Sequence, residues 1–351
     1  MDSSNRNPTL SEKDWPELLR DSSRSGGQNS QTFKKPTGAR WQAKVDGNVR
    51  TAPLLRDRFL YVTSLSGYLS AIDVATGRPR WKYRAGAAIH STPSLSGKRV
   101  LFGCGDGNVY AVDSEVGTKL WNFTTAAEVW ASPVVRSDVV FVGSADGITY
   151  AVNIETGALK WKQSLGGRIY STAFATEQCV FTGCGDGYVY GLDAKTGTIV
   201  WKTGTGNGID SSPAVVGETV LVGSNDFFFY ALNAGDGSIE WKYEAGLGIS
   251  SAPAVSGELV FFGSKDGIFQ ALDLHTGRLA WKTRVGQAIT APPVVSGSTV
   301  WIQSGMIHAL ATTDGKILWR AGLGDSVQSA PVVTEDGIYL ASIQGDIYAL
   351  A

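Results

Sequence analysis

The amino-acid sequence predicts an all-β fold: an eight-bladed β-propeller of four-stranded antiparallel blades, closed by the N-terminal strand completing the last blade. Three observations support this prediction. Tryptophans recur about every 40 residues, Asp-Gly and Thr-Gly pairs recur between runs rich in Val, Ile, Phe and Tyr, and the last repeat lacks its fourth strand. A period of about 40 to 45 residues is the length of four short strands with their turns, which is one propeller blade.

The tryptophan series sets the period. Its members are 40 residues apart until the last, which follows after 38: Trp41, Trp81, Trp121, Trp161, Trp201, Trp241, Trp281 and Trp319. Each falls in the last strand of its unit, where an indole ring fills the wedge between neighbouring sheets and donates its N–H to a nearby carbonyl. We therefore expect these rings to be structural core and not to stack on a cofactor.

The glycine pairs are predicted to form the turns of each blade. The Asp-Gly pairs begin at Asp106, Asp146, Asp186 and Asp266, and the Thr-Gly pairs begin at Thr76, Thr156, Thr196 and Thr276. Such pairs supply the positive φ that tight hairpins need, so we interpret them as turn chemistry and expect no metal site. The recurring Asp73, Asp113, Asp193 and Asp273 are expected to cap turns.

The two ends of the repeat array complement each other. The last unit begins at Trp319 and stops after its third strand, whereas the segment TGARW, Thr37 to Trp41, is a fourth strand without the three before it. Joining them completes the eighth blade and removes the open edges of the ring. We expect an N-terminal extension, residues 1–36, that packs on the propeller, and a single propeller domain, residues 37–351.

Charge and cysteine usage restrict the class of partner and the compartment. The chain carries 31 basic and 32 acidic residues without a basic run, so nucleic acid and anionic membranes are not expected partners. The three cysteines form no CxxC pair, and Cys104 and Cys184 share a repeat position where most copies have serine. With no apolar signal core in residues 1–30, we expect a cytoplasmic protein, or an extracytoplasmic one if a leader is missing from this sequence.

The repeat also resembles a known family. The motif SSPAVVGETVLVGSNDFFFYALNAGDGSIEW recurs across residues 41–351 and resembles the PQQ-like repeat of quinoprotein alcohol dehydrogenases and of BamB-like outer-membrane assembly lipoproteins. Residues Asp14 to Gly26 are similar to the Trp-Pro segment that precedes the first blade in such proteins, with Leu18 and Leu19 in place of the usual aromatic. The resemblance implies the fold and says little about activity.

Two functions that the resemblance implies are not supported by the cysteines. Quinoprotein dehydrogenases stack an adjacent Cys-Cys pair on the quinone and bind calcium, whereas no two cysteines are adjacent in this chain. We therefore expect no PQQ and no other cofactor. BamB-like proteins carry a lipid-bearing cysteine near their start, and the first cysteine in this sequence is Cys104.

One column of the repeat differs in every copy. It precedes the small residues at the start of each innermost strand, and in blades 1 to 8 it reads Arg50, His90, Trp130, Tyr170, Asp210, Ser250, Thr290 and Gln328. Residues two apart in a strand face the same way, so this column and the uniformly small column two residues later should both face the central tunnel. The small column is Ala52, Thr92, Ser132, Thr172, Ser212, Ala252, Pro292 and Ala330.

Blade 5 carries a second irregularity at the same end of the tunnel. Phe227 occupies a position where other copies have a turn glycine, and Phe228 follows it. Losing that glycine costs about 1 kcal/mol of backbone freedom, which suggests a packing or binding reason for the aromatic ring. Together with Glu128 and Arg168 at the rim of neighbouring blades, these residues are expected to form an aromatic-lined mouth around a ligand.

The preferred hypothesis is a small-molecule pocket on the axis that also runs acid–base chemistry without a cofactor, of the cyclase, lyase or isomerase type. His90 would exchange protons near neutral pH, Tyr170 would donate to an oxyanion, and Asp210 would act as a base or orient a cation. Arg50 would hold a carboxylate and Trp130 would be a stacking wall. Ser250, Thr290 and Gln328 would complete the lining of the pocket.

Three alternatives remain open at this point. The polar column could merely line a water-filled tunnel without a ligand. The protein could instead be a BamB-like interaction scaffold that binds a protein partner through its rim or blade edges. A PQQ-dependent dehydrogenase is the least favoured alternative. The oligomeric state is not predicted.

Overall fold

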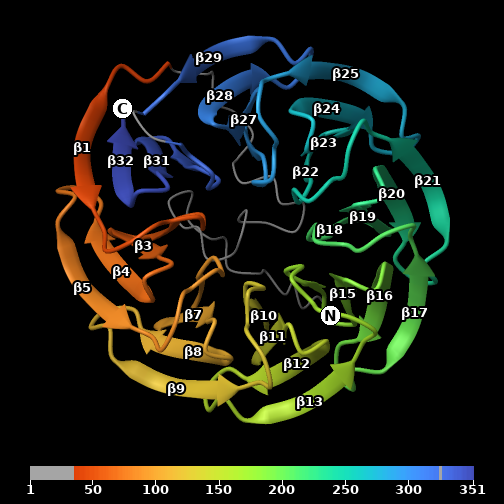
Figure 1. Cartoon of the computed structure of the whole chain (residues 1–351), viewed down its shortest axis with the longest axis horizontal. Coiled ribbons are helices and arrows are strands. Elements are labelled where there is room, and N and C mark those ends of the chain that lie inside the picture. Colours follow the sequence, from red (N-terminus) through yellow and green to blue (C-terminus); the bar gives the residue numbers. More distant parts are fainter. Residues whose placement is uncertain (1–34, 324–325) are drawn as a thin grey trace, which may run out of the picture.

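The structure is a computed structural model that describes residues 35–323 and 326–351. These residues form eight four-stranded antiparallel sheets arranged as blades around a central axis (Figure 1), which confirms the predicted fold class. The expected packing of an N-terminal extension, including the Trp-Pro segment, lies outside the described residues. No helix in the described part is long and apolar enough to cross a membrane.

Each blade is numbered from the innermost strand outward. Blade 1 contains β2 (Leu54–Arg56), β3 (Phe59–Thr63), β4 (Tyr68–Asp73) and β5 (Pro79–Arg84). Blade 2 contains β6 (Ser94–Ser96), β7 (Arg99–Gly103), β8 (Asn108–Asp113) and β9 (Lys119–Thr124). Blade 3 contains β10 (Val134–Arg136), β11 (Val139–Gly143), β12 (Ile148–Asn153) and β13 (Leu159–Ser164). Blade 4 contains β14 (Phe174–Ala175), β15 (Cys179–Gly183), β16 (Tyr188–Asp193) and β17 (Ile199–Gly204).

The other half of the ring repeats this order and then closes. Blade 5 contains β18 (Ala214–Val216), β19 (Thr219–Gly223), β20 (Phe228–Asn233) and β21 (Ile239–Glu244). Blade 6 contains β22 (Ala254–Ser256), β23 (Leu259–Gly263), β24 (Ile268–Asp273) and β25 (Leu279–Arg284). Blade 7 contains β26 (Val294–Ser296), β27 (Thr299–Ser304), β28 (Met306–Ala311) and β29 (Ile317–Ala321). Blade 8 contains β30 (Val332–Thr334), β31 (Gly337–Ala341), β32 (Asp346–Leu350) and β1 (Ala39–Lys44).

The core lies between the blades. The two middle strands of a blade are buried on both faces, as in β11 and β12, whereas the outermost strand exposes alternate residues. Large side chains of the middle strands, such as Phe102, Phe141 and Phe262, are fully buried or nearly so. Burying a side chain of this size stabilises the fold by about 1.5–3 kcal/mol, so stability accumulates at every blade-to-blade contact.

The periodic tryptophans join each blade to the next, as predicted. The indole Nε1 of Trp81 donates to the carbonyl of Ser114 at 3.1 Å, and that of Trp161 donates to the carbonyl of Ala194 at 2.9 Å. The acceptor in each case follows the third strand of the next blade. The ring of Trp161 also packs under Gly197 of the Thr-Gly turn in blade 4, where a side chain would collide with it.

The aspartates act in turns, also as predicted. Asp73 Oδ1 accepts hydrogen bonds from the backbone N–H groups of Ala75 at 3.1 Å and Thr76 at 3.2 Å. In the Asp-Gly hairpin of blade 2, Gly107 has a φ of 82°, and Asp106 Oδ2 accepts a hydrogen bond from the hydroxyl of Tyr110 at 2.7 Å. Burial and this carboxylate together raise the pKa of Tyr110. The Asp-Gly pairs therefore stabilise the hairpins.

Ring closure follows the predicted scheme. Strand β1 pairs antiparallel with β32, and the two lie side by side in Figure 1. The backbone N–H of Thr37 donates to the carbonyl of Ala351 at 2.6 Å, and Lys44 forms an ion pair with Asp346 at 3.0 Å. The eighth blade therefore pairs two strands that are more than 300 residues apart in the sequence, and the edges of β1 and β32 that this pairing joins are no longer open.

Candidate functional site

A cavity of about 350 Å³ lies at the hub of the ring. Five members of the variable column line it: Arg50, His90, Trp130, Thr290 and Gln328. Six members of the small column line it as well: Ala52, Thr92, Ser132, Thr172, Pro292 and Ala330. The volume falls in the range of about 300–1,000 Å³ that is typical of small-molecule sites.

The two columns lie in irregular backbone, not in the innermost strands. Arg50 and Ala52 precede β2, which begins only at Leu54, and the same offset recurs around the ring. This differs from the expectation that strand alternation aims both columns at the axis. The segment that precedes each innermost strand crosses from the rim of the previous blade to the hub. Members of both columns still line the cavity, together with residues between them such as Thr51.

The small column has a structural task that sequence reasoning missed. The backbone N–H of Thr92 donates to the hydroxyl of Ser132 at 2.9 Å, that of Ser132 to the hydroxyl of Thr172 at 3.1 Å, and that of Thr172 to the hydroxyl of Ser212 at 3.0 Å. Each bond joins neighbouring blades and satisfies a buried backbone donor. The available signal was the run of Ser or Thr in blades 2 to 5, against Ala or Pro in the other four blades.

Three rings of the variable column stack on one another across blades 2 to 4. The ring centroids of His90 and Trp130 are 4.6 Å apart with an interplanar angle of 26°, and those of Trp130 and Tyr170 are 4.8 Å apart at the same angle. Both faces of the Trp130 indole are thus covered, although the side chain is 37% exposed. The expected stacking wall at Trp130 is therefore occupied by its own neighbours.

The environment of His90 favours the neutral imidazole. Burial lowers the pKa of His90, the positive charge of Arg50 lowers it further, and the negative charge of Glu128 opposes this change. Near neutral pH the ring therefore offers one N–H donor and one nitrogen acceptor to the cavity. A neutral ring beside a guanidinium can take up a proton as the pH falls, or when an anion occupies the space between them.

Replacing Arg50 by glutamine should raise the pKa of His90, because it removes the second cause of the downward shift. The measurement is a pH titration of the histidine ring signals by NMR, in which the His90 signal is identified by its loss in His90→Ala. Arg168→Gln serves as the control, since this exposed arginine contacts Tyr170, and it should leave the titration of His90 unchanged. An unchanged midpoint in Arg50→Gln would contradict the described proximity.

The remaining members of the expected catalytic set are held by other partners. Of the three residues, His90 alone lines the cavity. The hydroxyl of Tyr170 accepts a hydrogen bond from Arg168 at 3.2 Å, which raises the pKa of the arginine. Asp210 Oδ2 accepts a hydrogen bond from the side-chain Nδ2 of Asn225 at 2.8 Å, and Oδ1 of the same Asn225 side chain accepts one from Lys265 at 2.7 Å.

Ser250, the blade 6 member of the variable column, is likewise outside the residues that line the cavity. Its hydroxyl is buried and has no hydrogen-bond partner among the described residues. Blades 4 to 6 therefore contribute no member of the variable column to the cavity, whereas blades 7, 8, 1, 2 and 3 each contribute one. The partners Asn225 and Lys265 were not identified from the sequence, because they lie outside the column that varies.

The rim differs from the aromatic mouth that the sequence suggested. Phe227 keeps the positive φ of the turn glycine it replaces, at 79°, and its ring is 44% exposed. Phe228 instead lies under the ammonium group of Lys242 on the outermost strand, 4.7 Å from its ring centroid. The pairing register explains this contact. Phe228 pairs with Glu244 of β21, so Lys242, two residues before Glu244, lies within reach of the Phe228 ring. Glu128 and Arg168 are exposed in neighbouring blades, as expected.

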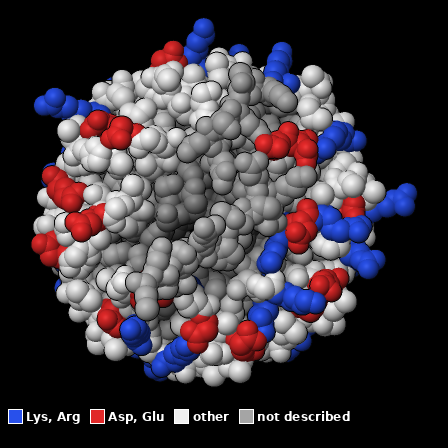
Figure 2. Space-filling view, turned by 180° about the vertical axis from the view of Figure 1, so that it is seen from behind, with Lys and Arg blue, Asp and Glu red and all other residues white. Residues whose placement is uncertain are grey.

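The charges and thiols of the described residues agree with the composition. On the face shown in Figure 2, both acidic and basic side chains lie around the ring, with mainly acidic ones along the left edge of the view. All three cysteines are free, and Cys104 and Cys184 donate to the carbonyls of Ala87 and Gly167 at 3.3 and 3.2 Å. No three His, Cys, Asp or Glu side chains of the described part gather as metal ligands would.

Comparisons with known proteins support the fold and the family. A sequence model described as "Outer membrane protein assembly factor BamB" matches residues 22–181, 185–290 and 276–351. The structure is similar to BamB from Moraxella catarrhalis, with a TM-score of 0.77 and 22% identity over 89% of this chain and 99% of that one. No curated protein matches the chain in sequence.

Two further solved structures show how widely the architecture is shared. The chain is similar to the computationally designed Ika8 protein, with a TM-score of 0.79 and 19% identity over 88% of this chain and 98% of that one. It is also similar to a quinohemoprotein alcohol dehydrogenase from Pseudomonas putida, with a TM-score of 0.83 and 15% identity over 95% of this chain and 76% of that one. A designed protein and an enzyme share the architecture, so these similarities concern the fold.

Proposed function

The chain belongs to the family of the outer membrane protein assembly factor BamB, and on this premise we propose that it is a propeller that binds a small planar carboxylate in its axial cavity. The observation that carries the proposal is the convergence of Arg50, His90 and Trp130 on one cavity of about 350 Å³. The residues that flank this column change little from repeat to repeat, so three large and chemically different groups at one hub favour a ligand site over a plain water-filled tunnel.

The chemistry of the lining favours an anion with a flat ring. Arg50 is exposed to the cavity, and a guanidinium binds carboxylates through paired hydrogen bonds. The charge of Arg50 acts on His90, and Trp130 covers only one face of the His90 ring. A planar carboxylate would stack on His90 while its negative charge meets Arg50. The hydroxyl groups of Thr290 and Thr92 would then contact the polar edge of the ligand.

Acid–base catalysis is the finer form of this proposal, and His90 is its centre. The carboxylate would offset the positive charge of Arg50 and so favour the protonated imidazole of His90, which could then donate a proton to the ligand. Tyr170 would act through Arg168, and Asp210 through Asn225, since each is already hydrogen-bonded to that side chain outside the cavity. Cys104 and Cys184 lie two blades apart against carbonyls and do not fit the adjacent thiol pair of quinone enzymes.

Benzoate, used as a probe, should bind the wild-type protein in isothermal titration calorimetry, and Arg50→Gln should weaken it about tenfold or more. A hydrogen bond to a charged group contributes roughly 1.5–3 kcal/mol, and 1.4 kcal/mol corresponds to about tenfold in affinity. Arg168→Gln is the matched control and should change the affinity little. Benzamide, which lacks the charge, should bind more weakly than benzoate. Equal binding of benzoate to wild type and Arg50→Gln would contradict the proposal.

A second candidate, a protein-interaction scaffold, is favoured by a separate observation. Apolar side chains are exposed near the start of successive outermost strands: Leu120, Leu159, Ile199, Val200, Ile239, Leu279 and Leu318. We propose that this series on the outer edge is a contact surface for a protein partner. The two candidates differ in their response to variants. A scaffold would lose its partner in Val200→Asp or Phe227→Ser and keep it in Arg50→Gln, whereas an axial ligand site would respond in the opposite order.

A cytoplasmic location is also part of the proposal. Its support is the presence of three free thiols, two of them buried, since unpaired cysteines are typical of reducing compartments. Fractionation of cells that produce the full native protein would test it. Recovery of the protein with the envelope fraction would contradict it.

A further inference from the structure

Three hydroxyl groups that line the hub cavity carry protons that no described residue accepts. The hydroxyls of Ser132 and Thr172 each accept a hydrogen bond from a backbone N–H of the preceding blade, at 2.9 and 3.1 Å, but donate none to a described residue. The hydroxyl of Thr92 has no hydrogen-bond partner of either kind among the described residues, although Thr92 is only 9% exposed. All three residues line the cavity.

The free donors are gathered on one side of the cavity. They belong to the small column of blades 2 to 4, whereas blades 7, 8 and 1 have Pro292, Ala330 and Ala52 in this column, which offer no side-chain donor. A hydroxyl that is removed from bulk water and donates to nothing is costly. The group that suits this side of the cavity is therefore a hydrogen-bond acceptor.

These hydroxyls are separate from the group that binds the carboxylate in the proposed function. Arg50 belongs to the variable column of blade 1, and a guanidinium binds both oxygens of a carboxylate through paired hydrogen bonds. The three hydroxyls belong to the small column, and they continue away from Arg50 over the next three blades. They are therefore placed to receive a second group of the same ligand.

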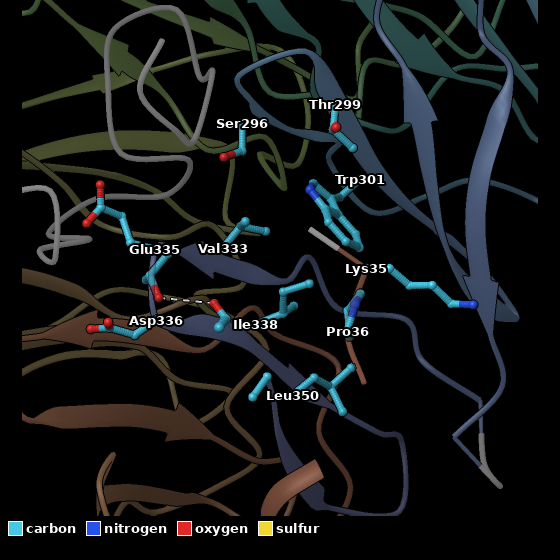
Figure 3. A pocket seen from close by; sticks show the side chains of 13 residues that line it. Lys35, Pro36, Ser296, Thr299, Trp301, Val333, Glu335, Asp336, Ile338 and Leu350 are labelled. Atoms are coloured by element: carbon cyan, nitrogen blue, oxygen red, sulfur yellow. Dashed lines mark hydrogen bonds between the residues drawn. The ribbon is translucent and has the colours of Figure 1, made fainter. Parts of the chain in front are cut away.

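The volume of the hub cavity leaves room for such a group. A second cavity, between blades 7 and 8, gives the scale: its volume is about 150 Å³, and Figure 3 shows Trp301, Val333 and Ile338 around it. An apolar cavity of roughly 150 Å³ admits one benzene ring. The hub cavity measures about 350 Å³, so it has room for a ring that carries a substituent besides the carboxylate.

We propose that the ligand of the axial cavity is a ring carboxylate that also carries a carbonyl group, and that this carbonyl accepts a hydrogen bond from the hydroxyl of Thr92. The hydroxyl of Ser132 in the next blade is the second donor, since a carbonyl oxygen has two lone pairs. The inference rests on the proposed axial function and names the second polar group of the ligand. Thr92 is then a residue that determines specificity, whereas Arg50 supplies the affinity for the carboxylate.

The test compares two probes of the same planar shape by isothermal titration calorimetry. 4-Acetylbenzoate carries the carbonyl, and 4-isopropenylbenzoate has a methylene group in place of its oxygen. The wild-type protein should bind 4-acetylbenzoate about three- to tenfold more tightly, which is the usual worth of one hydrogen bond. Thr92→Val should weaken 4-acetylbenzoate by about threefold or more and leave 4-isopropenylbenzoate unchanged. No described backbone group is bonded to the Thr92 hydroxyl, so this variant should fold, which a melting curve checks.

Two control variants accompany Thr92→Val. Thr92→Ser keeps the hydroxyl and should keep the preference for the carbonyl probe. Thr219→Val removes a hydroxyl that donates to Glu240 on β21 and should change neither affinity. Equal binding of the two probes to wild type, or an unchanged affinity of Thr92→Val for 4-acetylbenzoate, would overturn the inference while benzoate binding that depends on Arg50 still stood. If neither probe nor benzoate bound, the axial carboxylate site itself would fall, and this inference with it.

Discussion

Trp161→Ala is expected to lower the free energy of unfolding by about 3–5 kcal/mol, the usual cost of removing a buried tryptophan. The ring is 8% exposed, lies 5.8 Å from the ring of Phe141, and is covered by Gly197 of the next blade. Its indole nitrogen also bonds to the carbonyl of Ala194 at 2.9 Å, which would lose its partner. Urea unfolding followed by far-ultraviolet circular dichroism measures the change.

Trp130→Ala provides the control for this prediction. Trp130 is of the same residue type but stands at the hub, where it is 37% exposed and stacks on two neighbouring rings. Its removal should cost only about 1–2 kcal/mol, from the loss of the two stacking contacts. If both variants lost stability equally, the assignment of the periodic tryptophans to the core, and of the variable column to the site, would be wrong.

Gly263→Val should destabilise the protein by about 3 kcal/mol or more through overpacking. Gly263 ends β23 where blade 6 meets the segment that leads to blade 7, and an added Cβ would collide with the side chain of Ile289. The backbone N–H and carbonyl of Gly263 are both bonded to the hydroxyl of Ser251, at 3.1 and 3.0 Å, so the strand cannot move away without breaking these bonds. Thermal melting and urea unfolding should both report the loss.

Gly322→Ala is the matched control for Gly263→Val. Its nearest contact would be the Cε atom of Met306 at 3.8 Å, which is ordinary van der Waals distance. The change should stay within about 0.5 kcal/mol of wild type. A small effect of Gly263→Val, comparable to this control, would show that the blade interface is looser than the structure describes.

The sequence was sufficient to predict the fold because the physical requirements of a blade recur in every copy. The indole of Trp81 needs a carbonyl in the next blade, and the hairpin at Gly107 needs a positive φ. Each requirement therefore appears as the same residue type at the same spacing in successive repeats. The ends of the array also had to complete one sheet, which fixed the pairing of β1 with β32. Each repeat therefore indicates the same blade structure independently.

The candidate site was predictable only in part. The variable column was recognised as axial, and Arg50, His90 and Trp130 do meet at the cavity. The sequence could not show that Trp130 is enclosed by its neighbours, or that Asp210 is held by Asn225, because side-chain contacts across blades leave no periodic mark. Phe228 was misplaced because the contact of its ring with Lys242 depends on the register between β20 and β21.

The closure of blade 8 has a mechanical consequence. Strand β1 runs antiparallel to β32, so Thr37 and Ala351 lie at the same end of the pair. Tension applied to these two residues would load the backbone bonds one after another, as in a zipper, and not all together in shear. The bond between Thr37 and Ala351 would break first, and the pairs that follow would part in turn toward Lys44 and Asp346. Blade 8 is therefore the place where we expect the closed ring to open when Thr37 and Ala351 are pulled apart.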